Sequence, residues 1–202
     1  MYKSGVRDYV KFIGEANKVA NGLPISYEVI SDEDNEILDE AKILNKLGKN
    51  AWIKIPVIKS NGDSNIKLIN NCLVDGIKIN ITAVFDISQL EGLIETAKDS
   101  CIVSIFAGRI ADAGIDPVGV VKLFKQSALG EKTNLLWAST REVFNIIQAE
   151  QAGCDIITVQ PELLSKTKNF GKDLIEYSRE TVQMFEKDAK SAGLILTGAH
   201  KA

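Results

Sequence analysis

Short apolar segments alternate with amphipathic segments along most of this chain. The stripe of apolar residues over Val6–Val19, mostly three and four apart, predicts a first helix. Six apolar segments rich in β-branched residues follow, and each leads into a helical pattern. They are Leu23–Ile30, Ala51–Ile58, Ile77–Val84, Cys101–Ala107, Asn134–Ser139 and Asp155–Val159. Because near-continuous apolar runs are typical of strands buried on both faces, the pattern predicts an α/β protein with a parallel sheet covered by helices.

The helices between these strands are marked by capping residues and by apolar spacing. Ser31–Asp34 supplies an N-cap and an acidic first turn for a helix that ends near Leu47. Further helices are expected over Ser64–Val74, Ser88–Ala97, from Pro117 after a loop at Gly108–Asp116, over Arg141–Ala152 and over Pro161–Lys166. The last amphipathic segment, Asp173–Leu194, is expected to pack against the body of a single domain that spans residues 1–202.

Polar residues recur inside the apolar runs. They are Glu28, Lys54, Asn80, Thr82, Ser104 and Ser139. In an open, doubly wound sheet such residues would cluster near one crevice, whereas their spread over successive strands favours the lumen of a TIM-type (β/α) barrel with a site at its mouth. A closed barrel of this type has eight strands, so six predicted strands behind a leading helix indicate an incomplete barrel.

Composition narrows the class of protein. The chain has 202 residues, 45% of them hydrophobic, which suits one core, and its 24 basic and 27 acidic residues argue against binding to nucleic acid or to an anionic membrane. Neither a long apolar run nor a secretory signal is evident, so we expect a soluble, cytoplasmic protein. The chain has three cysteines, an odd number, and all lie in apolar surroundings: Cys72, Cys101 and Cys154. This predicts reduced thiols and not a disulfide framework.

Lys54 is the candidate nucleophile. It stands between Ile53 and Ile55, and if its side chain faces the lumen, desolvation disfavours the charged ammonium and leaves an amine that can attack a ketone. The alternative is a strand-end lysine that extends to solvent, and spacing alone favours that alternative. Lys78 in the next strand has similar surroundings without comparable partners, so we interpret it as a lysine that extends to solvent.

Glu28, Asn80 and Thr82 lie on the strands before and after Lys54 along the chain. Together they can place a carboxylate and two hydrogen-bonding groups around one water or substrate hydroxyl. A Schiff-base mechanism needs such a proton shuttle, first to expel water from the carbinolamine and then to take a proton during retro-aldol cleavage. The alternative for Glu28 is a solvated glutamate at a strand end.

Arg109 and Arg141 follow the ends of two late strands that also carry Ser104 and Ser139. Two guanidinium groups, a serine and the N-terminus of the helix expected after Arg141 form an anion site suited to a phosphate ester. The alternative is a pair of surface arginines in helix caps. Against this alternative, each arginine follows a strand that ends in a small residue, where a ligand can approach closely.

The sequence predicts neither a metal nor a nucleotide cofactor. His200 stands alone near the C-terminus, and no metal-ligand cluster or Ser/Cys–His arrangement can be built around it. No Walker loop is present, and no G-x-G-x-x-G motif follows a strand.

Four ordered motifs resemble the transaldolase and fructose-6-phosphate aldolase family. They are Trp52–Val57 around Lys54, Gly76–Ala83 around Asn80 and Thr82, Ser104–Ile110 around Phe106 and Arg109, and Trp137–Arg141 around Ser139. The resemblance implies a class I aldolase barrel that needs no metal, in which Lys54 forms the Schiff base and Glu28 acts through a water as acid and base. It further implies that Asn80 and Thr82 hold the intermediate and the water. Substrate hydroxyls and phosphate would bind to Ser104, Arg109, Ser139 and Arg141.

Two positions distinguish branches of that family. Glu28 and Phe106 are similar to the transaldolase branch, whereas the aldolase branch tends to have a glutamine and a tyrosine there. The expected function is therefore transfer of a dihydroxyacetone unit from a ketose phosphate to an aldose phosphate in the pentose phosphate pathway. The alternatives are a fructose-6-phosphate aldolase, which releases free dihydroxyacetone, and a truncated, inactive barrel that binds sugar phosphates.

The front of the chain departs from the family pattern. Family members begin with a strand that bears an aspartate and a second strand that ends in Thr-Asn-Pro, whereas Met1–Gly5 resembles the start of the helix after that second strand. The first two strands of the family barrel are therefore expected to be absent, and with them an acid/base aspartate and an asparagine that lines the site. Unpaired sheet edges and the resemblance together predict a homo-oligomer.

Overall fold

The computed structural model describes residues 5–95 and 99–194. It divides into two compact units, Met1–Gln160 and Pro161–Ala202. His200 and the end of the helix predicted over Ser88–Ala97 lie outside the described residues. The single domain that includes the C-terminal helix stays a prediction.

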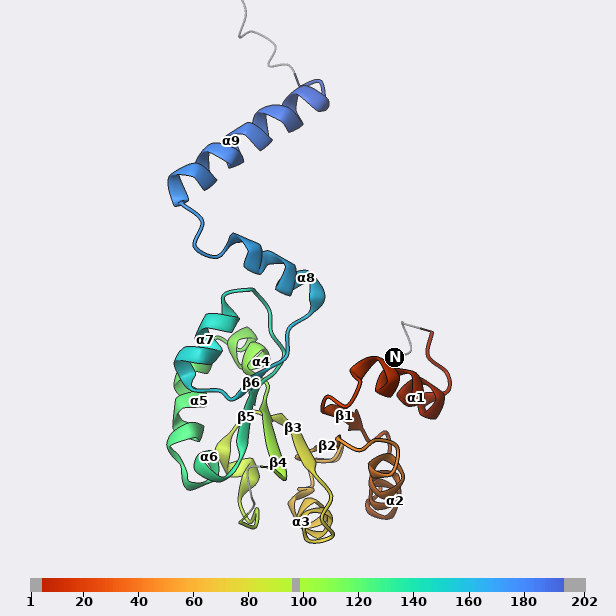
Figure 1. Cartoon of the computed structure of the whole chain (residues 1–202). Coiled ribbons are helices and arrows are strands. Elements are labelled where there is room, and N and C mark those ends of the chain that lie inside the picture. Colours follow the sequence, from red (N-terminus) through yellow and green to blue (C-terminus); the bar gives the residue numbers. More distant parts are fainter. Residues whose placement is uncertain (1–4, 96–98, 195–202) are drawn as a thin grey trace, which may run out of the picture. The chain divides into compact units, whose positions relative to one another are not determined.

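The first unit contains one six-stranded parallel sheet whose strands lie in chain order (Figure 1). The strands are β1 (Ile25–Glu28), β2 (Ala51–Pro56), β3 (Ile79–Val84), β4 (Cys101–Ile105), β5 (Asn134–Trp137) and β6 (Ile156–Ile157). The sheet curls into a half-barrel, and helices cover its outer side. This confirms the predicted α/β fold with six parallel strands, an incomplete TIM-type barrel.

Seven α-helices are described in this unit. They are α1 (Tyr9–Ala20), α2 (Asp34–Asn45), α3 (Ile66–Val74), α4 (Ala107–Asp112), α5 (Pro117–Gln126), α6 (Ala128–Lys132) and α7 (Asn145–Ala152). Their ends follow from local chemistry. The Asp8 carboxylate accepts a hydrogen bond from the backbone N–H of Lys11 at the start of α1, and Asp116 caps α5 in the same way ahead of Pro117.

Three predicted connections are wrong in detail. The helix α4 (Ala107–Asp112) occupies the first part of the loop expected over Gly108–Asp116. The sequence does not predict α4 because this helix has only six residues and no side-chain cap. In place of a helix from Ser88, the 3₁₀ turn η2 (Ile87–Leu90) is capped by Asp86. α7 begins at Asn145 and not at Arg141.

The two faces of the curled sheet differ in chemistry. Alternate strand residues pack toward the helices in the main core: Ile53, Ile55, Ile79, Ile81, Val103, Ile105, Leu135 and Trp137. The residues between them face the concave side, where Trp52, Ile102, Leu136 and Ala138 form a separate small apolar cluster. Lys54, Asn80 and Ser104 share the alternation of this second set. Because successive strand side chains point to opposite faces, the polar residues within the apolar runs line the inner surface.

The three cysteines are thiols in the structure. Cys72 and Cys101 are buried, and Cys154 is partly exposed. Burial raises the pKa of Cys72 to about 11 and that of Cys154 to about 12, because a thiolate loses its hydration inside the protein. Both therefore stay protonated and unreactive at neutral pH.

The second unit is short and helical. It contains α8 (Pro161–Leu164), the 3₁₀ turn η3 (Ser165–Asn169) and α9 (Leu174–Ser191), which begins where Asp173 accepts a hydrogen bond from the N–H of Glu176. The predicted final helix is confirmed, and its packing against the body stays a prediction. Over the described residues, no helix is both long and apolar enough to cross a membrane.

Candidate active site

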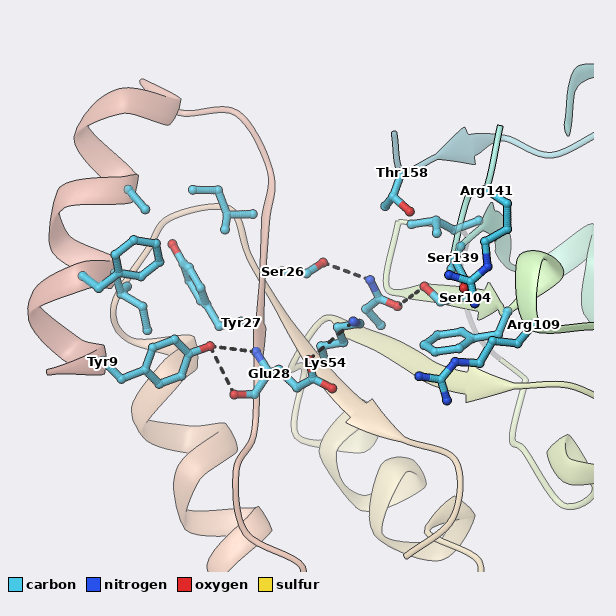
Figure 2. A pocket seen from close by; sticks show the side chains of 18 residues that line it. Tyr9, Ser26, Tyr27, Glu28, Lys54, Ser104, Arg109, Ser139, Arg141 and Thr158 are labelled. Carbon is cyan, nitrogen blue, oxygen red and sulfur yellow. Dashed lines mark hydrogen bonds and ion pairs between the residues drawn. The ribbon is translucent and has the colours of Figure 1, made fainter. Parts of the chain in front are cut away.

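The concave face of the sheet opens onto a cavity of about 520 Å³ at the carboxyl ends of the strands. In parallel barrels this end carries the active site, because the loops after the strands converge there. Of the nine site residues predicted from the sequence, eight line the cavity and Thr82 does not (Figure 2). The eight that line it are Glu28, Lys54, Asn80, Ser104, Phe106, Arg109, Ser139 and Arg141.

Lys54 and Glu28 face each other across neighbouring strands. The register of β1 and β2 pairs the two residues directly, and Lys54 Nζ lies 3.5 Å from Glu28 Oε2. The Lys54 side chain is 27% exposed and that of Glu28 is 46% exposed. An ion pair this open to water contributes little to the stability of the fold. Its significance is chemical, because it places the Lys54 amine within reach of a carboxylate that can exchange protons with it. This is the arrangement expected of a nucleophile beside its proton shuttle.

Asn80 is fixed beside Lys54 by two serines. The Ser104 hydroxyl donates to Asn80 Oδ1 at 2.7 Å, and Asn80 Nδ2 donates to the Ser26 hydroxyl at 3.0 Å. The register of β2 and β3 places Asn80 next to Lys54. Ser26 is not among the residues predicted from the sequence, although it lies two residues before Glu28 and so shares its face of the strand.

Thr82 lies one step further along β3, at the level of Pro56 in the neighbouring strand. Its side chain is buried, and the hydroxyl has no hydrogen-bond partner within the described residues. The register of β3 with β4 shifts between Ile81 and Val84, where Ala83 has a left-handed φ of 57°. Bulges of this kind occur next to active sites, where they re-aim a side chain.

The other wall of the cavity is cationic. The Arg109 guanidinium on α4 lies 5.7 Å from the centre of the Phe106 ring. Arg141 Nη2 pairs with Asp112 Oδ2 at 2.5 Å, and the Arg141 backbone N–H donates to Asn145 Oδ1 at 2.9 Å. The predicted pair of arginines is therefore brought to one wall. The helix N-terminus expected directly after Arg141 is instead four residues away, at the start of α7.

A close backbone contact joins the two segments that carry these arginines. The N–H of Gly108 on α4 donates to the carbonyl of Ala138 at 3.4 Å, and a Cβ atom on Gly108 would lie 1.7 Å from the Ser139 carbonyl oxygen. Ser139 itself has a left-handed φ of 63°. Only glycine at position 108 lets α4 approach the end of β5 so closely.

Within residues 5–95 and 99–194, no group of three or more histidine, cysteine, aspartate or glutamate residues is arranged to hold a metal ion. The groups that converge on the cavity are an amine, a carboxylate, an amide, hydroxyls and two guanidinium groups. This set suits acid–base and nucleophilic chemistry on a small polar anion.

Comparison with known proteins identifies the family of this chain. The family model described as Transaldolase/Fructose-6-phosphate aldolase matches residues 7–195. A probable transaldolase of Methanococcus maripaludis is 32% identical over 171 residues, which cover 84% of this chain and 76% of the relative. A probable transaldolase 2 of Listeria monocytogenes is 32% identical over 162 residues, 79% of this chain and 71% of the relative. The chain belongs to the transaldolase/fructose-6-phosphate aldolase family.

Proposed function

We propose that this protein is a transaldolase that transfers a dihydroxyacetone unit from a ketose phosphate to an aldose phosphate through a Schiff base on Lys54. Such a reaction belongs to the pentose phosphate pathway. The observation that carries the proposal is the Lys54 amine 3.5 Å from the Glu28 carboxylate, on the inner face of the half-barrel and next to Asn80. The family membership supports the same class of enzyme.

The chemistry would follow from these contacts. The Lys54 amine adds to the ketone carbonyl and its nitrogen loses a proton through a water to the Glu28 carboxylate. Glu28 returns this proton through the water to the carbinolamine hydroxyl, which leaves as water. Glu28, again through the water, takes the proton of the C4 hydroxyl as the carbon–carbon bond breaks, so the aldose phosphate departs as an aldehyde and three carbons remain on Lys54 as an enamine. The enamine carbon then attacks the carbonyl of the acceptor aldose phosphate. Asn80, held by Ser104 and Ser26, would hydrogen bond to the intermediate. The Thr82 hydroxyl, which has no hydrogen-bond partner among the described residues, would bind the water.

The cationic wall would select substrates that carry a phosphate. Arg109 and Arg141 reach the cavity from two segments, and Ser139 lines the same cavity. Guanidinium groups match the oxygens of a phosphate ester through paired hydrogen bonds. Phe106 at the end of β4 lacks the hydroxyl with which a tyrosine could hold a water for release of dihydroxyacetone, which favours transfer to an acceptor over release.

We expect Arg109→Ala to raise the KM for fructose 6-phosphate by about 10-fold to 100-fold, because a charge-assisted contact to phosphate contributes about 1.5–3 kcal/mol. The KM for unphosphorylated fructose should change less than twofold. Steady-state kinetics with both sugars checks this difference. Lys122→Ala, on the exposed surface of α5, is the matched loss of one positive charge and should change neither value.

Borohydride trapping with fructose 6-phosphate, followed by peptide mass spectrometry, tests the proposed function. A reduced adduct on Lys54, with Lys78 unmodified, is the expected result. Turnover that depends on an added acceptor aldehyde would then identify a transferase, whereas release of free dihydroxyacetone without an acceptor would identify an aldolase. A folded protein that forms no adduct would support the third alternative, an inactive barrel that binds sugar phosphates.

A further inference from the structure

The backbone of Glu28 is held from outside the sheet by one phenol. β1 is the first strand of the sheet, and the N–H of Val29 donates to the Lys54 carbonyl at 3.1 Å. Because alternate residues of a parallel strand bond to opposite sides, the N–H and C=O of Glu28 point away from β2. The Tyr9 hydroxyl accepts from the Glu28 N–H at 3.0 Å and donates to the Glu28 carbonyl at 3.2 Å (Figure 2).

Tyr9 is itself well anchored. It is the first residue of α1, directly after the N-cap Asp8, and α1 buries Ile13 in the main core. Asn17 on the same helix donates to the Leu47 carbonyl at 2.7 Å. Burial raises the pKa of the Tyr9 phenol, so the hydroxyl keeps its proton and remains a donor at neutral pH.

The residues after Glu28 are held by a second side chain. The Glu40 carboxylate on α2 accepts from the N–H groups of Ile30 and Ser31 at 2.8 Å and 3.1 Å, and from the Ser31 hydroxyl at 2.7 Å. The Tyr9 side chain on α1 thus bonds to the outer edge of β1, and the Glu40 side chain on α2 bonds to the segment that follows this strand. Tyr9 is the one of these two that bonds to Glu28 directly.

We propose that Tyr9 is a positioning residue for the reaction, which keeps the Glu28 carboxylate opposite the Lys54 amine by holding the Glu28 backbone. This inference rests on the proposed function, in which Glu28 transfers protons. Without the phenol, the backbone N–H and C=O of Glu28 lose the partner that they have in the structure, and weakly bonded strand ends open locally. A displacement of about 1 Å in a catalytic group can reduce turnover by about 10²-fold.

The test compares Tyr9→Phe with Tyr27→Phe. Each variant removes one tyrosine hydroxyl from the contact between α1 and β1, but the Tyr27 hydroxyl donates to Asn17 and not to Glu28. We expect Tyr9→Phe to lower kcat by at least about 10-fold with KM within about twofold, because the sugar phosphate contacts lie on the opposite wall. Tyr27→Phe should keep kcat within about twofold. Amide hydrogen exchange at Glu28 should accelerate in Tyr9→Phe alone.

Other outcomes would overturn the inference. A Tyr9→Phe protein with wild-type kcat, or an equal fall in kcat for both variants, would show that the phenol contributes stability and not positioning. Unchanged exchange of the Glu28 amide would show that the phenol does not hold this backbone. If the wild type forms no Lys54 adduct, the proposed function fails. Faster exchange of the Glu28 amide in Tyr9→Phe would then show only that Tyr9 holds this backbone, and the role of Tyr9 in the reaction would be refuted.

Discussion

Replacing Lys54 with methionine is expected to reduce transfer from fructose 6-phosphate by at least about 10³-fold, which corresponds to about 4 kcal/mol of activation free energy. Methionine keeps the apolar stem but has no amine, so no Schiff base can form. The fold should persist, because a pair with side chains 27% and 46% exposed contributes little to stability. Coupled-enzyme assay of the released aldose phosphate measures the loss, and thermal unfolding checks the fold.

Lys78→Met is the matched control for this prediction. Lys78 directly precedes β3, and its ammonium lies 5.5 Å from the centre of the Trp52 ring. It does not line the cavity. We therefore expect turnover within about twofold of the wild type. Substantial turnover in Lys54→Met, or loss of turnover in Lys78→Met alone, would contradict the assignment of the nucleophile.

Gly108→Ala is expected to destabilise the protein by roughly 3 kcal/mol or more, because the new methyl group would lie 1.7 Å from the Ser139 carbonyl oxygen. Backbone lies on both sides of this contact, so α4 would have to move away from the end of β5. That movement would displace Arg109 and Ser139 together. We therefore expect the folded fraction of Gly108→Ala to bind sugar phosphate more weakly than the wild type. Urea denaturation measures the free energy of unfolding.

Gly119→Ala provides the control for the loss of a helical glycine. A Cβ at position 119 in α5 would lie 3.7 Å from Asp116 Oδ2, an ordinary contact. Because alanine has a higher helix propensity, this variant should be neutral or more stable by up to about 1 kcal/mol. Equal stability of the two variants would contradict the close approach of α4 to the Ser139 backbone.

Most of the fold could be predicted from the sequence, because period and composition are local properties. All six apolar runs became parallel strands, since each is nearly continuous and bounded by turn residues. The errors occurred where local signals are weak. α4 has six residues and no side-chain cap, and the η2 turn occupies a stretch whose polar start resembles a longer helix.

The candidate site was only partly predictable. Alternation along a strand indicates which residues share a face, so Lys54, Asn80 and Ser104 could be grouped in advance. Thr82 shares that alternation and yet does not line the cavity, since it is buried one step further along a strand with a local register shift. Ser26 shares the strand face of Glu28, but it lies in none of the four motifs that carry the family resemblance, so the sequence did not single it out.

By itself, the sequence determined the order of the strands along the chain, the polar residues on their inner faces and the resemblance to the transaldolase/fructose-6-phosphate aldolase family. Only the tertiary structure decided which groups touch. Strand register brought Glu28 to Lys54, and a glycine allowed α4 to reach the backbone of Ser139. The tertiary structure also placed the Tyr9 hydroxyl on the backbone of Glu28, which lies 19 residues further along the chain. The reason is that periodicity records which way a side chain faces, whereas a contact between distant residues depends on how whole elements pack.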